Sequence, residues 1–275
     1  MVLTSIVSVQ CGAALATDLF DQVGPEGVVF LRSAFAAAIL LAFARPGIEE
    51  IRRAGFRQVF LFALTFAGMN CFFYAAIARI PLGTAVTLEF VGPLGVAILG
   101  SRRRIDLLWA LMAAAGIALL SDGLGSQGIF SLGAVFALIA GVSWGLYIVQ
   151  SARVGAALPG VGALAVAIAI SAVLVAPLGI AEGGSDLLSA HSLAIGLAVG
   201  TMSSVIPYSL EIEALRRLPN AVFGVLMSLE PGVAALVGLI ALSQHLGAAE
   251  FAAIALVVFA SAGALRTSHP PPLDS

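Results

Sequence analysis

Ten long apolar stretches follow one another along this chain of 275 residues, and they constrain its fold more than any other feature. Short clusters of turn-forming or charged residues separate them, and such clusters cannot continue a helix through lipid. A helix needs about 20 apolar residues to cross the roughly 30 Å hydrocarbon layer of a membrane. Because the stretches lack the strict alternation of barrel strands, helices are predicted. The predicted spans are Val2–Phe20, Gly27–Ala44, Val59–Ile77, Pro81–Gly100, Leu107–Leu120, Ile129–Val149, Gly160–Leu178, Leu193–Ile212, Pro219–Leu242 and Gly247–Leu265.

The composition excludes a soluble domain. Hydrophobic residues make up 60% of the chain and charged residues 10%, whereas soluble domains carry about 25% charged residues. A soluble core of this size would need a polar shell that these residues cannot supply. The sequence therefore predicts an all-α membrane protein of about ten transmembrane helices.

Two segments 138 positions apart look like copies of one helix entrance. Arg79-Ile80-Pro81 leads to Pro93, and Arg217-Leu218-Pro219 leads to Pro231 at the same spacing. The four prolines are predicted to break or begin helices. The chain is thus expected to consist of two five-helix repeats and a disordered cytoplasmic tail, over residues 1–121, 129–265 and 266–275.

The arginines predict how the chain is oriented. All 13 basic residues are arginines, and eleven of them fall in alternate connections or after the last span, which places those segments in the cytoplasm. Both termini are then expected on the cytoplasmic side. Pro81 would begin a helix entered from outside and Pro219 one entered from inside. Repeats of opposite topology are typical of alternating-access carriers.

Longer motifs carry a family resemblance that extends over nearly the whole chain. They include Leu88-Glu89-Phe90-Val91-Gly92-Pro93 in the first half and Met227-Ser228-Leu229-Glu230-Pro231 in the second. With them the sequence resembles the drug/metabolite transporter superfamily, and within it the EamA-type transporters of ten helices in two repeats. The likeness is greatest to members that export threonine and homoserine across the bacterial inner membrane. It implies a proton-coupled secondary carrier that exports small amino acids through a cavity between its halves.

One departure from the family concerns the end of the ninth helix. Many members have a Gly-Glu pair there, whereas this chain has Leu242-Ser243-Gln244-His245 and no acid. A role of that glutamate in relatives therefore cannot be carried over to this chain.

Glu89 is the first candidate for a functional residue. It lies eight residues after Pro81, near the middle of its predicted span, where a charged side chain costs about 2.5–3.5 kcal/mol. A carboxyl group at this depth can exchange a proton during transport, and Pro93 would free backbone carbonyls beside it. The alternative is a protonated Glu89 that locks two helices through a hydrogen bond.

Glu230, immediately before Pro231, is the second candidate. At the offset of 138, Glu230 aligns with Gly92 and Glu89 aligns with Met227, so the two acids are not strict repeat partners. Their tasks can therefore differ, with one binding a substrate ammonium group and the other carrying a proton. A purely structural role for Glu230 stays open as well.

Polar and aromatic side chains supply further candidates for a substrate cavity. Three pairs are spaced three or four residues apart, so that each pair shares a helix face. These candidates are Gln10, Asn70 with Tyr74, Trp144 with Tyr147, and Tyr208 with Glu211. The alternatives are interfacial belts for the aromatic residues and helix contacts for Asn70 and Gln10. Arg32 is early in its span and is expected to extend toward the membrane surface.

Enzymatic and metal functions find no support in the motifs. The segment from Gly123 to Gly128 matches a dinucleotide-binding pattern, but it follows an apolar helix and lacks the acidic residue about twenty positions further on. Cys11 and Cys71 lie in different predicted spans without a Cys-x-x-Cys motif or a histidine cluster. No cofactor, metal or nucleic-acid partner is expected, and the chain is predicted not to be an enzyme.

The predicted partners are a small-molecule substrate, protons and the lipid bilayer, in the cell inner membrane. Three alternatives remain beside the amino-acid exporter. They are a carrier of another amino acid, drug or metabolite, a membrane-embedded enzyme, and a membrane subunit without transport activity.

Overall fold

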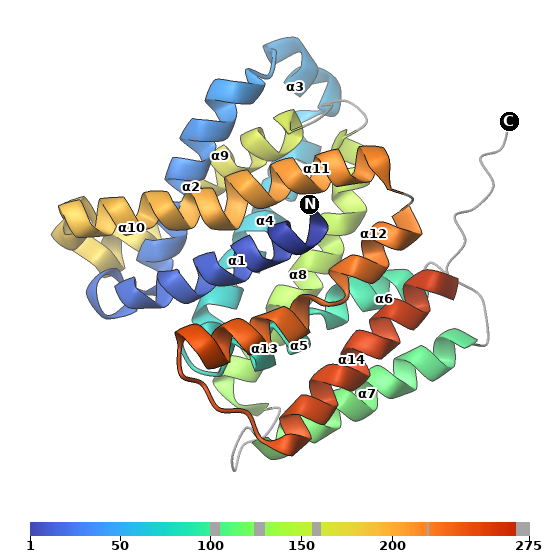
Figure 1. The fold of residues 1–275 in the computed structure, drawn as a ribbon. Helices are drawn as coiled ribbons and strands as arrows, with labels where there is room; N and C mark the ends of the chain where they lie inside the picture. Colours follow the sequence, from blue (N-terminus) through green and yellow to red (C-terminus); the bar gives the residue numbers. More distant parts are fainter. Residues whose placement is uncertain (100–104, 124–129, 156–160, 219, 268–275) are drawn as a thin grey trace, which may run out of the picture.

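The computed structural model describes residues 1–99, 105–123, 130–155, 161–218 and 220–267, and this part of the chain is helical without any strand (Figure 1). Pro219 and residues 268–275 of the predicted tail lie outside these residues. The long helices are α1 (Val2–Ala16), α2 (Phe20–Ala44), α4 (Phe56–Ile77), α7 (Ile105–Gly123), α8 (Leu132–Gly155), α9 (Gly162–Gly183) and α14 (Ala248–Thr267). The interrupted spans are α5 (Leu82–Glu89) with α6 (Val91–Leu99), α10 (Ala190–Gly200) with α11 (Ile206–Arg217), and α12 (Asn220–Met227) with α13 (Glu230–Ala241). A short helix, α3, covers Ile48–Ala54.

The number of crossings agrees with the prediction. Within the described ranges, eight apolar stretches are long enough to cross a membrane, and a shorter one covers Ile105–Leu120. The first of the eight, Val2–Ala44, contains both α1 and α2. As one straight helix it would measure roughly 65 Å, about twice the thickness of the hydrocarbon layer. The fold is therefore an all-α membrane protein of about ten spans.

A turn before Pro25 separates α1 from the membrane-spanning part of α2. Gly24 adopts a left-handed conformation with a φ of 68°, which favours glycine. The side chain of Glu182 from α9 occupies the space beside it, since a Cβ on Gly24 would lie 1.9 Å from Glu182 Cδ. Glu182 Oε2 also accepts a hydrogen bond of 3.0 Å from the Glu26 backbone N–H. The predicted turn is thus present and is fixed by a neighbouring helix.

The two proline-containing spans are interrupted at equivalent places. Shifting α5 by 138 positions gives the bounds of α12, so these two helices match residue for residue. The interruptions fall at Phe90 and at Ser228–Leu229. Both lie about one turn before the proline, and Pro93 and Pro231 themselves are in the first turn of the following helix.

Pro93 and Pro231 thus begin the second helix of each span, and the interruption lies before them. In a continuous helix, residue 93 would donate a hydrogen bond to the carbonyl of Glu89, and residue 231 to that of Met227. Proline lacks the N–H group, and its ring collides with that carbonyl. The distortion therefore appears beside the carbonyl that loses its donor, one turn earlier in the chain. Pro81, in contrast, directly precedes the first residue of α5.

A third interruption was not predicted from the sequence. Between α10 and α11, residues Thr201–Val205 form a π-helical turn, and Pro207 stands at the start of α11. Pro207 cannot donate to the carbonyl of Ser203, four residues before it. π-Helical turns of this kind often occur at functional sites.

Glycine allows close crossings between helices at two places near the interrupted spans. A Cβ on Gly92 of α6 would lie 1.8 Å from the carbonyl oxygen of Gly141 in α8. A Cβ on Gly83 of α5 would lie 2.7 Å from the Cα of Ala235 in α13. At the start of α5, the Leu82 backbone N–H donates a hydrogen bond of 2.9 Å to Oε1 of Gln244, just beyond α13. The two repeats are therefore in direct contact where α5 begins.

Candidate functional site

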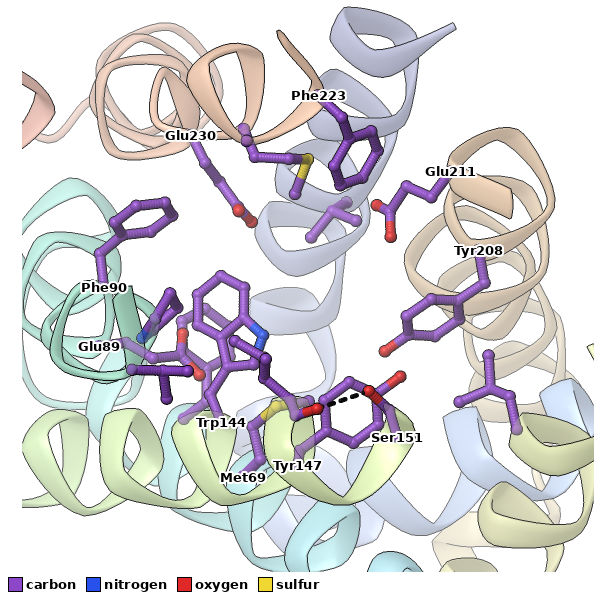
Figure 2. A pocket seen from close by; sticks show the side chains of 18 of the residues that line it. Met69, Glu89, Phe90, Trp144, Tyr147, Ser151, Tyr208, Glu211, Phe223 and Glu230 are labelled. Carbon is purple, nitrogen blue, oxygen red and sulfur yellow. Dashed lines mark hydrogen bonds between the residues drawn. The ribbon is translucent and has the colours of Figure 1, made fainter. Parts of the chain in front are cut away.

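A cavity of about 620 Å³ lies between the two halves of the molecule, within the usual range of ligand pockets, about 300–1,000 Å³. Helices from both halves of the chain form its wall, which is mostly apolar. Figure 2 shows aromatic and carboxyl side chains extending into this space from several helices. The polar or partly polar residues of the wall are Gln10, Arg32, Asn70, Glu89, Trp144, Tyr147, Ser151, Ser203, Tyr208, Glu211, Glu230 and Ser261.

Three carboxyl groups enter the cavity from different elements. Glu89 is the last residue of α5, Glu211 lies in α11, and Glu230 is the first residue of α13. Glu89 and Glu230 are each 7% exposed. Figure 2 shows Glu89 on one side of the pocket and Glu211 and Glu230 on others. The interruption of two spans at the cavity thus brings together acids that are 141 positions apart.

Two of the acids have hydrogen-bond partners on α1. Gln10 Nε2 donates a bond of 3.1 Å to Glu230 Oε1, and Ser5 Oγ donates a bond of 2.6 Å to Glu211 Oε1. The remaining side-chain acceptors of the first pair, Gln10 Oε1 and Glu230 Oε2, are buried without a partner among the described residues. A buried acceptor without a partner costs about 1–3 kcal/mol. This corner of the cavity therefore favours a ligand that donates hydrogen bonds.

Arg32 is a cavity residue that the sequence analysis placed wrongly. It does not extend to the membrane surface but is 6% exposed and lines the pocket. Its guanidinium donates to Ser204 Oγ at 3.2 Å, to Ser203 O at 3.0 Å, and to Asn70 Oδ1. These polar partners and the cavity are available inside the protein, so the side chain need not reach the surface to avoid lipid.

The sequence contained indirect signals for this arrangement. Arg32 and Asn70 are both polar residues within apolar runs, and Pro207 marks the span that supplies the Ser203 carbonyl. None of these signals specifies the helix face on which Arg32 lies. Because a single arginine in an apolar helix has no periodic partner, its direction depends on tertiary packing.

Tyr74 does not line the cavity, although it was predicted to share that role with Asn70. Its side chain is fully buried, and its ring centroid is 5.5 Å from the guanidinium carbon of Arg32. An arginine over an aromatic face at this distance forms a cation–π contact. Asn70 and Tyr74 share a face of α4, but Tyr74 is one turn further along the helix and lies behind the wall, against Arg32, Phe20 and Phe73.

Aromatic side chains shape another part of the wall. Tyr147 stacks on Phe62 with a centroid distance of 4.9 Å, and Trp144 makes an edge contact of 5.4 Å with Phe90. Tyr208 lies 6.3 Å from Phe66, measured between centroids. The aromatic candidates thus face the interior cavity rather than forming a belt at the membrane surface. Phe62 and Phe90 also line it and could not be chosen among 16 phenylalanines from the sequence.

Comparison with known proteins agrees with this architecture. The EamA-like transporter family matches residues 131–266. The threonine/homoserine exporter RhtA of Salmonella typhimurium (strain SL1344) is 39% identical over 99% of this chain and 92% of its own length. RhtA of Escherichia coli (strain K12) is 38% identical over 97% of this chain and 90% of its own. A protein of known crystal structure, 23% identical, has the same fold with a TM-score of 0.66 over 96% of each chain.

The ten apolar spans, the central cavity and these near full-length relatives lead to one conclusion. The chain belongs to the EamA-like transporter family and is a multi-pass membrane transporter.

Proposed function

We propose that this protein is a secondary active transporter that exports small amino acids, threonine and homoserine in particular, across the inner membrane. The observation that carries this proposal is the central cavity, whose apolar wall contains one arginine and three glutamates. An amino acid is a zwitterion and needs groups of both charges to replace its hydration shell. Relatives named threonine/homoserine exporter, 38–39% identical over nearly the whole chain, support this substrate class.

The two interrupted spans support transport by alternating access. They match in register at an offset of 138 positions, which favours a duplication into repeats over residues 1–121 and 129–265. Carriers built from inverted repeats bind substrate near the membrane midplane, where discontinuous helices end. Glu89 and Glu230 stand at such helix ends. The distribution of arginines supports opposite topologies of the repeats, with both termini in the cytoplasm.

The two acids have different proposed roles. Glu230, together with Gln10, binds the substrate ammonium group, because both residues line the cavity and each has an acceptor without a partner among the described residues. Glu89 is the coupling residue that takes up and releases a proton as the carrier changes direction. The buried position of Glu89 at the end of α5 supports this role, since ionisable groups inside membrane helices are commonly part of ion pathways.

Flux into proteoliposomes tests this function. Purified protein is reconstituted, and the movement of labelled threonine and homoserine is measured with and without an imposed pH gradient. We expect saturable flux that increases when protons can move in the opposite direction. Protein-free liposomes provide the control, and chromatography of the label checks that the substrate is not converted. Flux of neither amino acid, or equal flux in the presence and absence of protein, would contradict the proposal.

A further inference from the structure

We propose that Arg32 is the binding group for the substrate carboxylate, so that the amino acid lies in the cavity with its ammonium group toward Glu230 and Gln10. This inference rests on the proposed function, because it takes the substrate to be an α-amino acid. It adds a requirement that the function alone does not contain. The substrate must carry an ionised carboxylate, and the orientation of the substrate is determined by one arginine of α2.

The charge of Arg32 is not matched by a direct ion pair. Among the described residues, no carboxylate oxygen lies within 4.0 Å of its guanidinium nitrogens, whereas surface arginines such as Arg217 do have such partners. The acceptors around Arg32 are all neutral, namely a serine hydroxyl, a backbone carbonyl and an amide oxygen. A buried cation with only neutral partners strongly favours an anion.

The free donors of Arg32 suit a carboxylate. A guanidinium group has five N–H donors, and described residues use one on each of its three nitrogens. Two donors remain, one on each terminal nitrogen. Parallel donors from two nitrogens of one guanidinium are the usual partners of a carboxylate in a bidentate contact. Because Arg32 lines the cavity, a ligand can reach this group.

The surroundings hold the guanidinium in place before a ligand arrives. The Ser203 carbonyl is available because Pro207 cannot donate to it. The ring of Tyr74 lies against the guanidinium from behind. Gly200 lets α10 approach α2 at this level, since a Cβ there would lie 2.9 Å from the Arg32 carbonyl oxygen. A binding group that is already ordered loses less entropy when the ligand binds.

Hydrogen-bond acceptors for the substrate ammonium group belong to other residues of the cavity wall. Glu230 Oε2 and Gln10 Oε1 are buried acceptors without a partner in the described part of the chain. An ammonium group has three N–H donors and can satisfy both of them. Arg32 offers two donors to a carboxylate, and this pair offers two acceptors to an ammonium group. The cavity therefore has complementary groups for both ends of an α-amino acid.

Competition with an analogue that lacks the carboxylate tests the inference. Threonine and threoninamide both carry the ammonium group and the side chain, but only threonine has a carboxylate. Each is added unlabelled to compete with labelled threonine in proteoliposome counterflow, using wild type, Arg32→Gln, Arg32→Lys and the surface control Arg217→Gln. We expect wild type and Arg217→Gln to prefer threonine at least tenfold, in line with a hydrogen bond between charged groups. Arg32→Lys keeps part of that preference, and Arg32→Gln loses it.

The possible outcomes separate the two proposals. If Arg32→Gln weakens both compounds equally and keeps the preference, Arg32 is a structural residue and the inference is wrong. If wild type transports threonine without preferring it over threoninamide, the inference fails while the proposed function stands. If wild type transports neither threonine nor homoserine, the proposed function is wrong, whatever the result for the Arg32 variants. Should Arg32→Gln not fold, Arg32→Lys decides, because it retains the positive charge and loses only the paired donors.

Discussion

The two interrupted spans share one architecture, but their neighbours hold them in different ways. At the first interruption, the backbones of α6 and of the end of α5 are in direct contact with the backbone of α8. A Cβ on Gly92 would lie 1.8 Å from Gly141 O, and a Cβ on Gly141 would lie 2.5 Å from Glu89 O. No side chain fits between these segments. The first interruption is therefore fixed rigidly against a neighbouring helix.

At the second interruption, the contact with the neighbouring helix α1 is made by side chains, both apolar, as at Ile6 and Met227, and polar. Gln10 donates to Glu230, and each of these residues keeps one acceptor unpaired. Gly232 of α13 has open space around it, since a Cβ there would meet nothing within 4 Å. The molecule thus contains one interruption held by direct backbone contact with its neighbour and one held by side chains, among them a buried polar pair. The two acids therefore have different surroundings, which supports the separate roles proposed for them.

The largest effect that would distinguish the two interruptions is expected at Glu89. Glu89→Gln removes the ionisable group while keeping the shape of the side chain, so proton-coupled flux should fall to the level of protein-free liposomes. Counterflow of labelled threonine, which needs no net proton movement, should continue. Flux is measured under an imposed pH gradient with the amount of reconstituted protein matched to wild type. Coupled flux equal to that of wild type would remove the coupling role from Glu89.

At Glu230 we expect a weaker and different effect. Glu230→Gln removes the charge that attracts the substrate ammonium, and a hydrogen bond to a charged group contributes about 1.5–3 kcal/mol. The KM for threonine should therefore increase by roughly tenfold or more, while the maximal rate changes little. Glu213→Gln is the matched control, because Glu213 is an acid of α11 that pairs with Arg217 at the surface. A fall in maximal rate with unchanged KM would place Glu230 in the coupling step instead.

The packing difference can be measured as stability. Gly92→Ala places a methyl group against the backbone of Gly141, and overpacking of this kind typically costs about 1–3 kcal/mol. We expect a lower melting temperature of the purified protein in detergent, with loss of transport in proportion to loss of folded protein. A melting temperature equal to that of wild type would show that α6 and α8 are not in rigid contact.

The smallest effect is expected at Gly232, with the opposite sign. Gly232→Ala meets no neighbouring atom, and alanine in a helix is more favourable than glycine by roughly 0.5–1 kcal/mol. The melting temperature should stay the same or increase slightly. A loss of stability as large as that of Gly92→Ala would mean that the two interruptions are packed equally tightly.

The spans and the two matching interrupted helices could be predicted from the sequence because both depend on local patterns. Long apolar runs determine where helices cross, and the spacing of Pro81 and Pro93 is repeated in the second half. The interruptions lie one turn before Pro93 and Pro231, because proline cannot donate a hydrogen bond to the carbonyl four residues earlier. The π-helical turn before Pro207 was missed for the same reason.

Most candidate cavity residues could also be proposed, because a polar residue in an apolar helix usually faces the interior. Glu89, Glu230 and Asn70 are of this kind, and all three line the cavity. Arg32 and Tyr74 were placed wrongly because their positions depend on contacts between α2, α4 and the π-helical turn. Such contacts join residues far apart in the chain, and no helical period indicates them.

The hydrogen bond between Gln244 and the first N–H of α5 has a mechanical consequence. It lies close to the crossing of Gly83 with Ala235, so the two repeats are joined at one end of these spans by a side chain and by backbone contact. If the spans rotate about this contact, a small tilt there becomes a larger displacement at the far end of each span. Because the glutamine amide carries no ionisable proton, this hydrogen bond does not itself respond to pH.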